Sequence, residues 1–107
     1  MKFVNRGYML VKPTQLFIDW ATEKDETSFL SLEFSEGNIY LIEEDFMDEE
    51  PILKANFKAI FQNEFESVEE NEAEWPCDCK LENLEMYFTV EFGSSVFDLN
   101  KSDLKAD

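Results

Sequence analysis

The segment 51–68 constrains the fold most, because its apolar residues recur at the spacing of one helical face. Positions three or four apart lie on the same side of an α-helix, and the apolar residues that share this side are Leu53, Phe57, Ile60, Phe61, Phe65 and Val68. A helix with three phenylalanines on one face is not stable alone in water and must pack on a sheet or on other helices. The rest of the chain has to supply that surface.

The residues before this helix predict a mixture of strands and a helix. An apolar run at 6–12 predicts a strand that is covered on both faces or lies centrally in a sheet. Helical spacing over 14–22 predicts a helix, with Thr14 as its N-cap. The segment 39–42 predicts a strand. The alternating pattern at 29–34 leaves two interpretations, a strand or a helical turn. We favour the strand, which would form a hairpin with 39–42; otherwise a loop leads into 39–42.

The residues after the long helix predict a second, shorter set of elements. The apolar spacing over 80–88 indicates a short helix, and 89–99 reads as extended chain. Gly93-Ser94-Ser95 fits either a bulge in one long strand or a hairpin turn between two short strands. The polar segment 100–107 is expected to form a frayed tail.

This order of elements predicts one α+β domain spanning 1–107. We expect a two-layer sandwich in which a small sheet of three to five strands packs against two or three helices. The 107 residues include 44% apolar and 15% aromatic residues, which suffices for one core and sets the chain apart from disordered acidic chains, because these are poor in aromatics.

The net charge excludes several classes of partner. Nine Lys and Arg against 25 Asp and Glu give −16, and there is no histidine. Nucleic-acid phosphates and acidic membrane surfaces should repel such a chain, and catalysis that depends on histidine is excluded. No apolar run is long enough to span a membrane or resembles a signal peptide, so we expect a cytoplasmic protein. A basic protein or a cation would be attracted, although the charge can also serve solubility alone.

The acidic run 43–50 is the strongest candidate for a binding surface. It carries six carboxylates and one phenylalanine, and leads directly into the long helix. It contains no glycine, so it does not match a calcium-binding EF-hand loop, and we predict no metal and no cofactor. With an aromatic anchor from the loop that follows the helix, the predicted binding residues are Glu43, Glu44, Asp45, Phe46, Asp48, Glu49, Glu50 and Trp75. The simpler alternative is that the run only starts the helix, whose dipole favours acidic residues there.

A second hypothesis is a small carboxylate-dependent enzyme or ligand-binding protein. Its cleft would be lined by the aromatic residues Trp20, Tyr40, Trp75 and Tyr87. Glu91 and Asp98 are the first candidates for an acid–base pair. Cys77 and Cys79 are separated by one residue, which suits neither a zinc site nor a mutual disulfide, so we expect free thiols.

Several segments resemble a family of small, acidic, uncharacterised bacterial proteins. The resemblance rests on 6–13 (RGYMLVKP), 17–20 (FIDW), 40–42 (YLI), Trp75-Pro76 and 90–99 (VEFGSSVFDL). It implies a bacterial, cytoplasmic, single-domain protein and supplies no catalytic residue or cofactor.

These observations favour a non-enzymatic protein–protein interaction module that binds a basic partner. It would act as an adaptor, a regulator or an immunity-type inhibitor of a basic toxin. In a narrower version, its spaced carboxylates imitate DNA phosphates and occupy a nucleic-acid-binding protein. Both versions predict association that weakens with salt.

Overall fold

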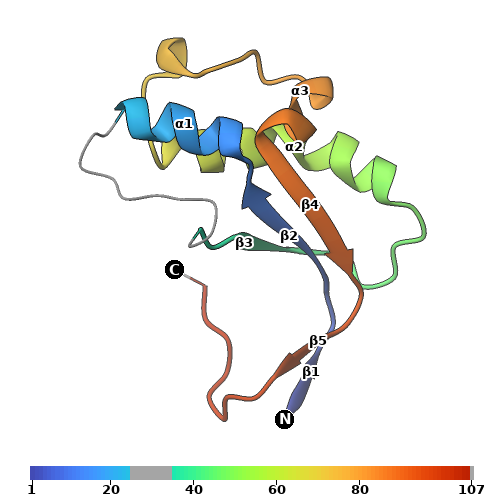
Figure 1. The fold of residues 1–107 in the computed structure, drawn as a ribbon. Coiled ribbons are helices and arrows are strands. Elements are labelled where there is room, and N and C mark those ends of the chain that lie inside the picture. Colours follow the sequence, from blue (N-terminus) through green and yellow to red (C-terminus); the bar gives the residue numbers. More distant parts are fainter. Residues whose placement is uncertain (25–34, 107) are drawn as a thin grey trace.

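Three antiparallel strands form the main sheet of the protein, in the order β3-β2-β4. A computed structural model describes residues 1–24 and 35–106 (Figure 1). Its elements in chain order are β1 (Lys2–Val4), β2 (Gly7–Pro13), α1 (Gln15–Lys24), β3 (Asn38–Ile42), α2 (Glu49–Glu66), the 3-10 turn η1 (Glu72–Glu74), α3 (Leu81–Tyr87), β4 (Phe88–Gly93) and β5 (Val96–Asp98). The predicted α+β class is confirmed, with β2 as the central strand of its sheet.

The helices pack on one face of this sheet. Alternate residues of β2 are buried, with Met9 and Val11 at 1% and 0% exposure. Because side chains alternate across a strand, these two point to the same face as their cross-strand neighbours Tyr40 and Val90. Helix α2 supplies the opposite side of the core, so the architecture has two layers.

The long helix follows the predicted pattern with two exceptions. Ile60, Phe61 and Phe65 are fully buried, and the other predicted apolar positions are half-buried. Ile52 is also buried at 3% exposure, although it lies outside the predicted apolar set. Glu64, a carboxylate on the same helix, is only 6% exposed. Ile52 therefore widens the buried face beyond the predicted apolar set, whereas Glu64 lies within that face, three positions after Phe61.

Phe65 is the centre of the aromatic core. Its ring lies 5.1–6.0 Å from six other aromatic rings, which come from four parts of the chain and belong to Phe17, Trp20, Phe61, Trp75, Tyr87 and Phe88. Ring pairs at these separations contribute beyond the area that they bury. The cluster joins α1, α2, α3 and the start of β4.

Strands β1 and β5 form a second, two-stranded antiparallel sheet that continues β2 and β4 (Figure 1). Val4 pairs with Val96 and Tyr8 pairs with Gly93. Between these pairs, the three residues 5–7 face the two residues Ser94 and Ser95. The extra residue is a bulge on the N-terminal side. β4 and β5 do not pair with each other, so Gly93-Ser94-Ser95 is not a hairpin turn but an interruption in one long strand.

The remaining predictions concern the strand at 39–42, the N-cap at Thr14 and the C-terminal segment. The segment 39–42 forms β3, as predicted, and pairs with β2; its predicted hairpin partner, 29–34, lies outside the described residues. Thr14 directly precedes α1, but its hydroxyl donates a 2.7 Å hydrogen bond to the Met86 carbonyl and so links the start of α1 to the end of α3. Residues 99–106 have no helix or strand. Among the described helices, none has the length and apolar character that crossing a membrane requires.

Candidate functional site

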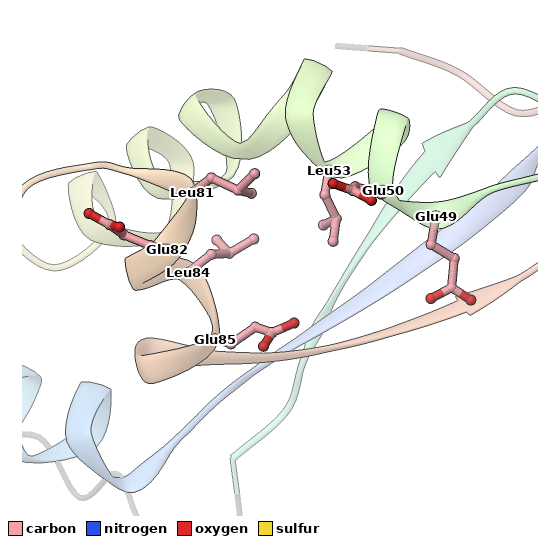
Figure 2. Close-up of a pocket in the computed structure, with 7 residues that line it drawn as sticks. All are labelled: Glu49, Glu50, Leu53, Leu81, Glu82, Leu84 and Glu85. Carbon is pink, nitrogen blue, oxygen red and sulfur yellow. The ribbon is translucent and has the colours of Figure 1, made fainter.

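A groove lies between the first half of α2 and helix α3. It has a volume of about 410 Å³, within the range of ligand-binding clefts. Its apolar floor consists of Leu53 from α2 with Leu81 and Leu84 from α3. Figure 2 shows these three side chains directed into the space between the two helices.

Four carboxylates surround this apolar floor. Glu49 and Glu50 come from the first turn of α2, and Glu82 and Glu85 come from α3. In Figure 2 the side chains of Glu49 and Glu85 extend into the space between the helices, whereas the Glu82 carboxylate extends from the other side of α3. Among the described residues, those that line the groove include no basic side chain; the exposed Lys54 pairs with Glu50, its Nζ 3.1 Å from Glu50 Oε1. The groove is therefore apolar at its floor and negative at its rim.

The groove uses two of the predicted binding residues, Glu49 and Glu50. Four of the others, Glu43, Glu44, Asp45 and Asp48, lie in the connection from β3 to α2, where Glu44 is half-buried and the other three are exposed. Phe46 does not stand free as an anchor, because it is half-buried with its ring 5.7 Å from Phe92. The acidic run thus lies beside the groove, with its aromatic residue turned toward the sheet.

Trp75 lies at the opposite end of α2 from the acidic run. The 18 residues of α2 span about 27 Å, and Trp75 packs 5.6 Å from Phe65 near the C-terminal end of that helix. Its indole N–H donates a 2.7 Å hydrogen bond to the Glu69 carbonyl. The structure therefore separates Trp75 from the other predicted binding residues.

Trp75 instead borders a second hollow, which contains both cysteines. This hollow has a volume of about 340 Å³, and its other lining residues are Lys58, Gln62, Glu72, Cys77, Asp78 and Cys79. Both cysteines are free thiols. Burial, with smaller contributions from Cys79 and Asp78, raises the pKa of the Cys77 thiol to about 11. The thiol is therefore protonated at neutral pH, which disfavours its use as a nucleophile or a metal ligand.

The buried carboxylate Glu64 is held by residues of β3. Asn38 Nδ2 and the Tyr40 hydroxyl donate hydrogen bonds of 2.7 and 2.5 Å to Glu64 Oε2. Asn63 Nδ2 donates to the Tyr40 oxygen at 2.9 Å. Burial, together with the bond to Glu64, raises the pKa of Tyr40 well above its ordinary value. These bonds tie the edge strand β3 to α2, which gives the buried charge a structural role.

The predicted aromatic cleft is filled by the core. Trp20 and Tyr87 are 8% and 6% exposed, and both pack on Phe65. Glu91 lies on β4 and Asp98 on β5, about 20 Å apart along an extended strand. This separation is too great for an acid–base pair. Within residues 1–24 and 35–106, no group of three or more Cys, Asp or Glu side chains is arranged to hold a metal ion.

The sequence did not identify the contribution of α3 to the groove. The helix itself was predicted, and Leu81 and Leu84 are spaced by three positions with a glutamate after each. That pattern was the only available signal. Which helix Leu81 and Leu84 face depends on long-range packing.

Comparison with protein-family models, with curated proteins and with solved structures gives no match to this chain. The fold and the groove together define an α+β protein with a negatively charged, apolar-floored surface site.

Proposed function

We propose that this protein is a non-enzymatic interaction module of the bacterial cytoplasm, and that a basic partner protein docks in the groove between α2 and α3. The observation that carries this proposal is the joining of an apolar floor to a rim of glutamates without a basic residue lining it. An apolar centre with a charged rim is the usual anatomy of a docking surface. The roles of adaptor, regulator and immunity-type inhibitor all require this same docking step.

The groove also indicates the chemistry of the partner. Leu53, Leu81 and Leu84 would take one or two apolar side chains of the partner, which supply most of the binding energy. Lysines or arginines beside them would face Glu49 and Glu85. Exposed charge pairs contribute little affinity each, but they speed the encounter and reject acidic proteins. The preferred ligand is therefore an amphipathic basic segment rather than a purely cationic one.

The proposal is tested with a synthetic amphipathic peptide of leucine and lysine and with its glutamate-for-lysine counterpart. Fluorescence anisotropy at about 50 mM and about 500 mM salt measures both affinities, because exposed charges are screened over this range. We expect the lysine peptide to bind, to weaken at the higher salt, and to be preferred over the glutamate peptide.

Two matched variants locate the binding. Glu49→Lys/Glu85→Lys reverses the charge of the groove rim, and Glu66→Lys/Glu70→Lys makes the same change in net charge at two exposed positions near the other end of α2. The rim variant should weaken binding about tenfold or more, since two attractive pairs become repulsive. Equal weakening in both variants would show that net charge, and not the groove, attracts the peptide.

A further inference from the structure

Four of the nine basic side chains of this acidic chain lie in one small part of the fold. Residues 1–6 and 94–106 contain β1, β5 and the segment after it, and we call them the terminal ribbon. The terminal ribbon carries four basic and two acidic side chains, whereas residues 7–93 carry five basic and 22 acidic ones. Lys2 Nζ donates to the carbonyls of Lys101 and Ser102 at 3.2 and 3.0 Å and pairs with Asp103 Oδ1 at 3.3 Å, which holds the final segment against β1. The ribbon therefore carries a small positive net charge, supplied by Arg6, Lys101 and Lys105, on a strongly negative body.

The terminal ribbon also exposes much apolar surface. Among the described residues, half of the ten large apolar side chains that are exposed belong to it, namely Met1, Phe3, Phe97, Leu99 and Leu104. Phe3 and Phe97 are directly opposite each other across the two strands, with ring centroids 5.6 Å apart. Both remain more than half exposed, at 55% and 57%. Exposed apolar side chains gathered in one place mark an interaction surface.

The terminal ribbon, with its exposed apolar side chains and its basic residues, is complementary to the apolar floor and acidic rim of the groove. We infer that the groove between α2 and α3 of one copy receives the terminal ribbon of a second copy of this chain. Phe3 and Phe97 would lie on the floor of Leu53, Leu81 and Leu84, and basic side chains of the ribbon would face the glutamates of the rim. The inference rests on the proposed function of the groove, and it identifies the basic segment that docks there as the terminal ribbon of a second copy.

The contact has to form between copies. The chain leaves α3 at Tyr87 and runs through β4 to β5 at Val96, about 30 Å further along an extended strand. Figure 1 shows the terminal ribbon at the end of β4 that is remote from α3. The ribbon can therefore reach its own groove only if β4 separates from β2.

The geometry of the contact predicts head-to-tail association. Two different surfaces meet, so in a pair one copy keeps a free groove and the other keeps a free ribbon. The net charge of −16 opposes the approach of two copies. A contact made by two strands and two helices is also at the small end of protein interfaces, where complexes are transient. We therefore expect reversible association that depends on concentration.

Sedimentation velocity on the full chain tests the inference. The weight-average mass should rise above the 12.6 kDa of the monomer as the concentration increases. Phe3→Ser/Phe97→Ser should abolish the rise, and so should Glu49→Lys/Glu85→Lys. The matched control Ile39→Ser/Leu41→Ser removes two equally exposed apolar residues from β3, at 64% and 51% exposure, and should associate like the wild type. The melting temperature of each variant verifies that it folds.

Mixing the two blocked variants gives the sharpest result. One has an intact groove and the other an intact ribbon, so the mixture should form pairs and nothing larger. A wild type that stays monomeric, a mixture that does not pair, or a ribbon variant that still associates would overturn the inference. The leucine–lysine peptide separates this failure from failure of the proposed function, because the ribbon variant should bind the peptide with wild-type affinity whether or not copies associate.

Discussion

Phe65→Ala should cost close to the maximum for a single core substitution. The side chain is 0% exposed and contacts six aromatic rings. Truncation of a buried phenylalanine to alanine typically costs about 3–5 kcal/mol, and the lost ring pairs place this position at about 4–5 kcal/mol. Domains of this size are stable by only about 5–15 kcal/mol, so the variant should be marginally folded.

Urea unfolding followed by circular dichroism and by tryptophan fluorescence measures this cost. Both Trp20 and Trp75 contact Phe65, so fluorescence reports on the same cluster. Phe65→Leu provides a milder variant that should fold and cost about 1–2 kcal/mol. Phe3→Ala is the control, because Phe3 is 55% exposed and should cost about 1 kcal/mol or less. If Phe65→Ala costs under about 1.5 kcal/mol, or no more than Phe3→Ala, Phe65 is not the centre of the core.

Three further predictions concern charge and titration. Tyr40→Phe removes one of the donors to Glu64 and should cost about 1–3 kcal/mol by urea unfolding. Because the folded-state pKa of Tyr40 is raised, the stability that Tyr40 contributes is present below the ordinary tyrosine pKa of about 10 and is lost as the pH rises through the higher folded value. The wild type should therefore lose more stability above about pH 10 than Tyr40→Phe does. Equal losses would refute this assignment. In a Cys79→Ser background, alkylation of Cys77 should keep accelerating above pH 9, because burial, the largest cause of the raised pKa, remains after Cys79 is removed; a rate that levels off near pH 9, the ordinary value, would contradict the burial of this thiol. Adding salt up to about 0.3 M should raise the melting temperature by screening the repulsion within the −16 charge, and a flat melting temperature would show that the charges are too dispersed to matter.

The sequence predicted those features that depend on local periodicity. The apolar face of α2 is visible because positions three and four apart meet on one side of a helix, and Phe61 and Phe65 are buried as expected. The short run of β2 and the pattern of β3 likewise predict strands. The choice between bulge and hairpin at Gly93-Ser94-Ser95 required the partner strand, because only the pairing with residues 4–8 shows that the chain continues in one direction.

The remaining features depend on contacts between distant residues. Glu64 lies three positions after Phe61, so the helical pattern places it on the apolar face. The partners that allow a carboxylate to be buried there are Asn38 and Tyr40, which β3 brings to it from more than 20 positions away. The acidic run near Glu49 was recognised, but the apolar floor beside it comes largely from α3, more than 30 residues later. Sequence reasoning could find the charge of the site but could not find the surface that the charge surrounds.

The most direct test of the groove is to map where a basic ligand binds. Titration of the isotope-labelled protein with the leucine–lysine peptide, followed by two-dimensional NMR, reports each backbone amide. The largest shifts should appear at Glu49, Leu53, Leu84 and Glu85, with little change on the open face of the sheet around Ile39. Shifts centred on Trp75 and the second hollow, or spread evenly over all acidic segments, would contradict the central claim.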